Sequence, residues 1–234
     1  MEKIEYHFFW KGPLSNWSKS PFVFKNVEYN CGEQYMMHQK ALLFGDLTVS
    51  EEIMNEPSPR KQKDLGRKVA NFEKDVWELN CKDIMIRGLF EKFVQNQEHK
   101  KALLATEQKE LVEASPNDDI WGIGFDEENA MANIERWGTN YLGQVLMAVR
   151  KKIQLEDSFK SLGLISISPE WVPPMSGKYL VRTIGDSKVP YETEHILTAY
   201  VDRHWDEKKL KWKYSIDVHN QIPTHISKYP VLKK

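Results

Sequence analysis

The spacing of apolar residues changes near residue 155, and this change constrains the fold more than any other feature of the sequence. Before it, apolar residues recur with the period of a helix; the clearest stripe, within residues 139–154, consists of Leu142, Val145, Leu146, Val149 and Ile153. From residue 166 onward, alternating and aromatic runs separated by Pro, Gly and charged turns are typical of antiparallel strands. The sequence therefore predicts an α+β chain, with a predominantly helical domain over residues 1–157 and a small antiparallel β domain over residues 158–234.

Apolar spacing, caps and turn residues place the individual elements. We expect helices over Gly32–Phe44, from Ser58-Pro59 to Asn71, over Glu73–Gln95, over Glu98–Ala105 and over Thr139–Gln154. We expect strands over Val23–Tyr29, Glu110–Ala114, Lys178–Thr183, Ile196–Val201 and Lys211–Val218.

Composition and charge narrow the classes of function. The chain has 33 Lys and Arg against 34 Asp and Glu, so its net charge of −1 leaves any nucleic-acid contact to a local patch. No apolar run approaches the ~18 residues of a membrane-spanning helix, and the start lacks the apolar core of a signal peptide, so we expect a cytoplasmic protein with no membrane partner. Cys31 and Cys81 show neither a disulfide framework nor metal-ligand spacing. The oligomeric state stays open.

Charged residues share the apolar face of the first expected helix. At about 100° per residue, Glu33, Met37, Lys40 and Phe44 fall within one narrow wedge. Burying a charge among apolar groups is unfavourable unless the charge is paired or functional. Because seven residues of helix rise ~10.5 Å, Glu33 and Lys40 are spaced to bracket a ligand. The alternative, that both side chains reach the rim or bond to neighbours, is the commoner outcome for an arbitrary helix.

The segment SPNDDIWGIG is a second candidate. Asp118 or Asp119 can orient a ribose hydroxyl or accept a proton from water, and Trp121 offers a flat face to a base. Gly122 and Gly124 let backbone N–H groups approach a phosphate. Such a segment is also typical of an ordinary strand-to-helix turn, and two glycines do not make a dinucleotide fingerprint.

The start of the last expected helix is a third candidate. It follows Trp137, and free N–H groups at a helix N-terminus are suited to a phosphate or pyrophosphate. Simple capping by Thr139 or Asn140 is the commoner case. Trp77 in the long helix is suited either to stacking on a ligand or, more commonly, to the core.

In order along the chain, short motifs resemble those of the NADAR (YbiA-like) family. They are Gly12–Trp17 (GPLSNW), Glu33–Met36 (EQYM), Gln39–Ala41 (QKA), Gly66-Arg67, Trp77, Lys92-Phe93, Leu103–Thr106 (LLAT), Leu111–Glu113 (LVE), Asn117-Asp118, Trp121–Gly124 (WGIG), Trp137-Gly138 through Asn140, Leu142-Gly143 and Leu146–Arg150 (LMAVR). One tetrapeptide would mean little, but the ordered set, spread over residues 6–154, is specific.

This resemblance implies a compact, mostly helical α+β fold and N-glycosidase chemistry, a hydrolase reaction with no cofactor and no metal. Members of the family remove ADP-ribose from modified guanine in nucleic acid, or discard ribosylated pyrimidine intermediates of the riboflavin pathway. Motif by motif, the family's acidic site residue falls on Glu33, its aromatic residue on Trp77 and its loop acid on Asp118. Its motif lysine falls on Lys40, which the family's proposed mechanism uses in a Schiff base with the opened ribose.

The residue types are compatible with that chemistry. Cleavage of a ribose N-glycoside develops positive charge at C1′, which a nearby carboxylate stabilises. A neutral Lys40 amine, its pKa lowered by apolar neighbours, can add to the anomeric carbon. Direct attack by water, aided by Glu33 or Asp118, needs the same residues, and the sequence leaves both routes open.

Besides catalytic residues at Glu33, Lys40 and Asp118, we expect a set of substrate-binding residues. It consists of Asn16, Trp17, Gln34, Tyr35, Arg67, Trp77, Asp119, Trp121, Gly122, Gly124, Trp137 and Asn140. One departure from the family is Gly32, where relatives often have Ser, Thr or Ala; glycine weakens a helix start and favours mobility there. Asp119 beside Asp118 leaves open which acid points inward.

Residues from about 165 to 234 resemble a small domain of unknown function that is frequent in phage-encoded proteins. The residues that carry this resemblance are Trp171–Pro174, Gly177–Val181, Ala199-Tyr200, Trp205 and Thr224-His225. A run of basic and aromatic residues within it is suited to nucleic acid, although a solvated hairpin is the commoner alternative: Lys208, Lys209, Lys211, Lys213, Trp205, Trp212 and Tyr214.

Three functions follow from these patterns. The first is removal of ADP-ribose from guanine in DNA or RNA, as an antitoxin activity or in phage–host conflict, a role in which an accessory domain is useful. The second is a metabolic N-glycosidase that acts on a free ribosylated pyrimidine intermediate. The third is a module that binds ADP-ribose or a signal nucleotide without catalysis, against which the presence of both Glu33 and Lys40 argues.

Overall fold

The computed structural model describes the backbone of residues 4–161, the side chains of residues 4–158 and, beyond them, five strands. The chain divides into two compact units, Met1–Gln154 and Leu155–Lys234. Within the described residues, no helix is both long and apolar enough to cross a membrane.

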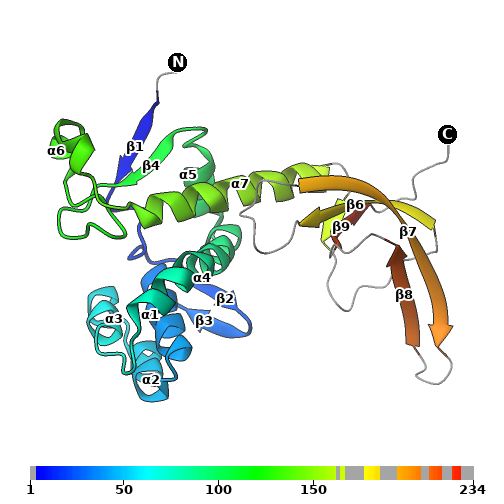
Figure 1. Cartoon of the computed structure of the whole chain (residues 1–234), viewed down its shortest axis with the longest axis horizontal. Coiled ribbons are helices and arrows are strands. Elements are labelled where there is room, and N and C mark those ends of the chain that lie inside the picture. The colour runs from blue at the N-terminus through cyan, green and yellow to red at the C-terminus, as the bar shows by residue number, and fades with distance from the viewer. Residues whose placement is uncertain are drawn as a thin grey trace. The chain divides into compact units, whose positions relative to one another are not determined.

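The first unit is predominantly helical, as Figure 1 shows. Its helices are α1 (Gly32–Leu43), α2 (Leu47–Asn55), α3 (Pro59–Gly66), α4 (Lys74–Gln95), α5 (Gln97–Leu104), α6 (Glu127–Ala130), the 3-10 helix η1 (Met131–Arg136) and α7 (Tyr141–Ser161), which runs past the end of the unit. Its strands are β1 (Tyr6–Phe9), β2 (Phe22–Phe24), β3 (Val27–Tyr29) and β4 (Glu110–Glu113). The predicted helical α+β fold of this part is confirmed.

The predicted single strand over Val23–Tyr29 is wrong, because the chain turns in its middle. β2 and β3 form an antiparallel hairpin in which Phe24 pairs with Val27. The turn residues Lys25 and Asn26 have φ values of 50° and 64°, as a two-residue hairpin turn with positive φ at both positions requires. Asparagine enters this region readily, but the turn lacks the glycine that usually marks it.

The helix expected from Ser58-Pro59 to Asn71 begins as predicted but ends at Gly66. A tertiary contact fixes the segment after it: the Asp46 side chain, which caps α2, also accepts a hydrogen bond from the Ala70 N–H at 2.8 Å. Asn71 then has a φ of 54°, which a helix does not allow. Neither α2 nor its cap was apparent from the apolar spacing.

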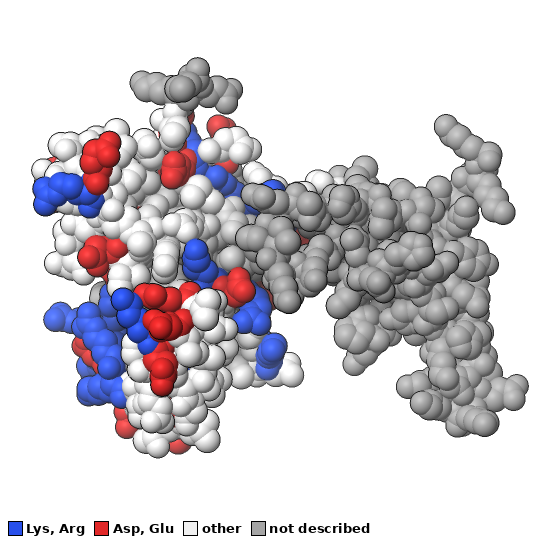
Figure 2. All heavy atoms as spheres, viewed as in Figure 1, with Lys and Arg blue, Asp and Glu red and all other residues white. Residues whose placement is uncertain are grey.

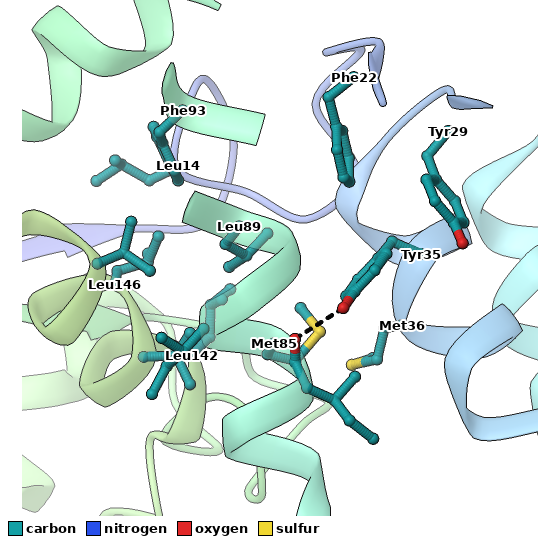
Figure 3. Close-up of a cluster of buried hydrophobic side chains, with 14 of the residues drawn as sticks. Leu14, Phe22, Tyr29, Tyr35, Met36, Met85, Leu89, Phe93, Leu142 and Leu146 are labelled. Carbon is teal, nitrogen blue, oxygen red and sulfur yellow. Dashed lines mark hydrogen bonds between the residues drawn. The ribbon is translucent and has the colours of Figure 1, made fainter. Parts of the chain in front are cut away.

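The core of the unit is built around α4. Met85, Leu89 and Phe93 of this helix are completely buried. In Figure 3, Leu142 and Leu146 of α7 lie on one side of Leu89 and Met85, and Tyr35 and Met36 of α1 lie on the other. The Tyr35 hydroxyl donates a hydrogen bond to the carbonyl of Ile84 at 3.0 Å, so the buried phenol is satisfied. α1 is thereby fixed against the centre of the fold.

α7 packs directly on β4, which pairs in parallel with β1. A Cβ at Gly143 would lie 2.0 Å from the carbonyl oxygen of Leu111, so only glycine allows this approach. Asn140, with a φ of 51°, donates its side-chain amide to that same carbonyl at 2.8 Å. Its Oδ1 accepts the N–H of Glu113 at 3.0 Å. The end of β4 is therefore held in place from α7.

In the second unit the structure describes the strands β5 (Leu164–Ser166), β6 (Gly177–Ile184), β7 (Glu194–Asp206), β8 (Lys211–Asp217) and β9 (Pro223–Ser227). Their backbones pair antiparallel in the order β5-β9-β6-β7-β8. The motif residues Trp171–Pro174, and Lys208 with Lys209, lie outside the described residues. The accessory domain over 158–234 and its nucleic-acid surface stay predictions.

We expect Gly143→Ala to lower the free energy of unfolding by about 3 kcal/mol, because the added methyl group forces α7 away from β4. Urea unfolding of the whole chain measures this. Lys151→Ala, on the exposed face of the same helix, is the matched control and should change stability by less than about 0.5 kcal/mol. Equal effects of the two substitutions would contradict the close approach.

Candidate functional site

Glu33 lies in the first turn of α1 and is only 3% exposed. Its Oε2 accepts a hydrogen bond from the indole Nε1 of Trp17 at 3.2 Å. Its Oε1 is buried and has no hydrogen-bond partner among the described residues. Burial raises the pKa of Glu33 to about 7, against the opposing effect of the Lys63 charge. This carboxyl therefore changes protonation near neutral pH and has one oxygen available to a ligand.

α3 packs closely on α1 and brings basic residues to Glu33. A Cβ at Gly66 would lie 2.0 Å from the sulfur of Met37, so glycine makes this contact possible. The charges of Lys63 and Arg67, from α3 and its C-terminal cap, both lower the pKa of Glu33.

Asp118 lies in the loop after β4 and forms an ion pair with Lys63, whose Nζ donates to Oδ2 at 2.9 Å. Its Oδ1 accepts the backbone N–H groups of Ile120 at 3.2 Å and Trp121 at 2.8 Å. Burial acts in the opposite sense, but these bonds hold the pKa of Asp118 below its ordinary value. Asp119 is exposed, so Asp118 is the acid of this loop that faces Lys63.

Glu113, the last residue of β4, is a further carboxyl of the same cluster. Burial is the main cause that raises the pKa of Glu113 to about 8, and the negative charges of Asp118 and Glu33 raise it further. The positive charge of Lys63 lowers it. Its position is fixed by close backbone contacts, since a Cβ at Gly122 would lie 2.8 Å from the Glu113 carbonyl and 2.9 Å from the Asp118 carbonyl. We call Glu33, Glu113 and Asp118 the carboxyl cluster; the three share the charge of Lys63.

A buried amine holds residues 15–17, which bond to Glu33 and are called the covering loop below. Lys92 of α4 is 0% exposed, and its Nζ donates to the carbonyl of Ser15 at 2.8 Å. Burial lowers the pKa of Lys92 to about 7. The next residue, Asn16, accepts the Glu33 N–H at 3.0 Å through its carbonyl, while its own side-chain Oδ1 is buried without a partner. Trp17 is 46% exposed, so the solvent-facing side of Glu33 lies at this indole.

Gly32, the departure from the family pattern, has a packing role. A Cβ at this position would lie 2.9 Å from Oδ1 of Asn16 and 3.1 Å from a methyl carbon of Leu89. Glycine therefore gives the covering loop room against the start of α1. The helix start is also capped, because the Cys31 sulfur accepts the N–H of Gln34 at 3.5 Å.

Lys40, near the C-terminal end of α1, lies in different surroundings. Its Nζ donates to the carbonyl of Gly66 at 2.9 Å and lies 4.1 Å from the ring centre of Phe72 and 5.9 Å from that of Trp77. Burial and the charge of Arg67 lower the pKa of this amine. Phe72 is 44% exposed, so an amine and an aromatic ring lie together near the surface.

Four predicted substrate-binding residues use their side chains within the fold. Each bonds to backbone groups of neighbouring elements: Gln34 to Asn30, Ile53 and Met54; Tyr35 to Ile84; Trp137 to Ala130; and Asn140 to Leu111 and Glu113. Trp121 is partly buried, with its ring edge-on to that of Tyr141. Asn16, Trp17 and Arg67 are the predicted binding residues that the structure brings to Glu33.

At the start of the last helix, the third candidate from the sequence, the backbone N–H groups already have partners. The N–H groups of Asn140, Tyr141 and Leu142 donate to carbonyls of residues 120–122 at 3.0 to 3.1 Å. The loop after β4 thus takes the donors that an anion would need. The same bonds fix the loop that carries Asp118.

Lys63, Glu113 and Lys92 were not singled out as site residues from the sequence. Lys92 carried the signal that identified Glu33, a charge on the apolar face of a helix beside Leu89 and Phe93. Glu113 and Lys63 carried no such signal. One ends a short strand and the other lies on a polar helix, and only tertiary packing brings them together.

The cluster is suited to moving a proton beside a developing positive charge. Asp118 is paired and ionised, while Glu33 and Glu113 titrate near neutral pH, so an acid and a carboxylate are present together. Among the residues with described side chains, no three His, Cys, Asp or Glu are arranged to hold a metal ion.

Comparisons with known proteins show the family of the chain. The NADAR domain model matches residues 8–154. N-glycosidase R617 of Acanthamoeba polyphaga mimivirus is 46% identical over 130 residues, which cover 55% of this chain and 76% of that protein. Protein irg-1 of Caenorhabditis elegans is 43% identical over 141 residues, which cover 58% of this chain and 66% of that protein, slightly less than two thirds.

The fold is also similar to a solved structure. The NMR structure of the E. coli protein YbiA superposes with a TM-score of 0.56 at 28% sequence identity. The alignment covers 68% of this chain and 90% of that chain.

The raised pKa of Glu33 has a consequence for stability. A carboxyl whose pKa rises on folding binds more protons in the folded state between pH 4.5 and about 7, so its stabilising contribution is lost as pH rises through that range. Glu33→Gln lacks this loss. Between pH 5 and pH 8 we therefore expect the difference in unfolding free energy, Glu33→Gln minus wild type, to increase by on the order of 2 kcal/mol.

Urea unfolding at several pH values measures this difference. Other titrating groups also change the stability with pH; Lys92, whose pKa is lowered, does so in the opposite sense. These contributions are the same in the variant and the wild type, so the difference between the two cancels them. Glu110→Gln, on the same strand as Glu113, is the control and should leave the pH dependence unchanged. A Glu33→Gln curve parallel to that of the wild type would show that the Glu33 pKa is ordinary.

Proposed function

The chain belongs to the NADAR family and is an N-glycosidase, and we propose that it removes ADP-ribose from guanine in nucleic acid. The observation that carries the proposal is the unpartnered Oε1 of buried Glu33, at the point where a basic helix meets the carboxyl cluster. The unpartnered oxygen can stabilise positive charge on the sugar as the C–N bond breaks, and the basic side chains of α3 can bind the phosphates of the substrate.

In this proposal Glu33 acts at the ribose. Its ionised carboxylate stabilises the positive charge that develops at C1′ as the C–N bond breaks. The unpartnered Asn16 Oδ1 supplies a second acceptor, suited to a ribose hydroxyl. Trp17 holds one oxygen of Glu33 and offers an exposed face to a base, and Asp118 holds Lys63 in place.

The phosphates of the substrate match the charge of α3. Figure 2 shows Lys and Arg side chains gathered over this helix. Arg60, Lys61, Arg67 and Lys68 are exposed, and Lys63 is half-buried. Because the whole chain has a net charge of −1, this patch is the local excess that a pyrophosphate or a nucleic-acid backbone needs.

Lys40 supports a covalent route through a Schiff base. The amine lies beside Phe72 and Trp77, its pKa is lowered, and the Gly66 carbonyl orients it. Loss of one proton makes it a nucleophile for C1′ of the opened ribose. Use in toxin–antitoxin or phage–host conflict, with residues 158–234 as an accessory domain on DNA or RNA, belongs to the same proposal.

We expect the wild type to release ADP-ribose from ADP-ribosylated guanine in DNA, and Glu33→Gln to lower kcat about 10²–10³-fold through loss of charge stabilisation. Borohydride added during turnover should trap a protein–sugar adduct that Lys40→Met lacks. Lys74→Met, at the exposed start of α4, is the matched control for both readouts.

The same assay with a ribosylated pyrimidine of the riboflavin pathway, and with free ADP-ribose, separates the alternatives. Turnover of the pyrimidine alone would replace the proposed substrate by the metabolic one. Binding without release of any base would refute catalysis on these substrates. Turnover without a trapped adduct would favour direct attack by water over the Schiff base.

A further inference from the structure

The carboxyl cluster has three acidic side chains but only one lysine that acts on all three. Because there are more negative than positive groups, one of the three acids is expected to keep its proton. Lys63 on α3, Glu33 on α1 and Asp118 in the loop are the charged groups that act on Glu113. Asp118 takes the direct ion pair with Lys63 and two backbone N–H bonds, so it is ionised. Burial raises the pKa of both remaining carboxyls, Glu33 and Glu113, and the negative charges of Asp118 and Glu33 raise that of Glu113 further. One of them therefore carries a proton.

Hydrogen bonding decides which of the two carries it. Glu33 Oε2 accepts the indole N–H of Trp17, an arrangement that favours the carboxylate. Within the part of the chain whose side chains are described, no group donates a hydrogen bond to the Glu113 carboxyl. Glu113 also meets the negative charges of both Asp118 and Glu33. Between about pH 7 and pH 8 the proton therefore resides mainly on Glu113, while Glu33 is mainly ionised.

Resting on the proposed function, we propose that Glu113 is the acid that protonates the leaving base, while Glu33 acts at the sugar. As the C1′–N bond breaks, its electron pair passes to the base, and the Glu113 proton is transferred to a nitrogen or carbonyl oxygen of that base. Attack at C1′ then completes the exchange: water supplies the oxygen, directly or by hydrolysis of the Lys40 imine, and its proton returns to Glu113. No oxidant or metal is needed, and the enzyme ends in its starting protonation state.

The backbone fixes this acid as such a role requires. The Glu113 N–H donates to Asn140 at 3.0 Å, and its carbonyl accepts the N–H of Ile123 at 3.0 Å. Gly122 keeps the carbonyls of Glu113 and Asp118 together. The buried, unpartnered Glu33 Oε1 is the independent sign that a ligand enters beside the cluster. Glu113 thus lies at a strand end whose backbone is fixed by hydrogen bonds on both sides.

The test uses Glu113→Gln, which keeps shape and polarity but cannot donate an acidic proton, with Glu110→Gln on the same strand as the matched control. On ADP-ribosylated guanine DNA we expect Glu113→Gln to lower kcat about 10²–10⁴-fold with little change in KM. The wild-type kcat/KM should fall as pH rises above about 8, and this alkaline limb should vanish in Glu113→Gln. Glu113→Asp should retain the limb at a reduced rate.

Infrared spectroscopy detects the proton on Glu113 without any substrate, because a protonated carboxyl group has its own absorption band, which is followed as the pH is raised. The part of this band that is lost on titration through about pH 8 should be absent in Glu113→Gln and present in Glu33→Gln, whereas the part lost through about pH 7 should be absent in Glu33→Gln. The reverse pattern, or a Glu113→Gln enzyme with the wild-type rate and alkaline limb, would overturn the assignment. A wild type that releases no base would refute the proposed function and this catalytic role together, whereas an active wild type with unaffected Glu113→Gln refutes only the role.

Discussion

The burial of Glu33 is the constraint on which the rest of the site depends. A carboxylate removed from water loses several kcal/mol of hydration unless nearby charges and donors replace it. Here the replacement comes from three directions: the indole of Trp17, the ammonium of Lys63 and the guanidinium of Arg67. Each belongs to a segment that must approach the start of α1. The covering loop and α3 are thus the two segments that replace the lost hydration of this carboxyl.

A second buried charge has the same effect on the other side of the loop. Lys92 is completely enclosed, yet its amine bonds to the Ser15 carbonyl, and that bond holds the segment on which Asn16 and Trp17 lie. A flexible surface loop would not keep the Trp17 indole at hydrogen-bond distance from Glu33. The Lys92 amine thus orders this loop from the core, together with the buried side chain of Leu14.

The parts of the fold that the sequence predicted are those governed by local spacing. The apolar stripes of α4 and α7, and the charged residues on the apolar face of α1, follow from helical period alone. The hairpin turn at Lys25-Asn26 was missed because positive φ values occurred without glycine. The early end of α3 was missed because Asp46 bonds Ala70 from a distant position.

The candidate site divides in the same way. Glu33, Lys40 and Asp118 were apparent from charge placement and from the family's motifs. Lys63 and Glu113 join them only through long-range contacts: the approach of α3 to α1 at Gly66 and the crowding of the loop at Gly122. The N–H groups at the start of α7 donate to residues 120–122, and these bonds fix the loop that carries Asp118. Sequence patterns identify chemical groups, whereas these contacts decide which groups meet.

The energetics of the cluster argue that a ligand completes it. A buried acceptor left without a partner costs about 1–3 kcal/mol, and the site contains two, on Asn16 and Glu33. A whole domain is stable by only about 5–15 kcal/mol, so leaving both open is a large expense for a purely structural arrangement. A glutamine or an apolar residue at position 33 would fill a similar space without placing an ionisable group in the interior. A ligand that brings donors or positive charge recovers this free energy on binding, which is the property expected of a site where charge develops during reaction.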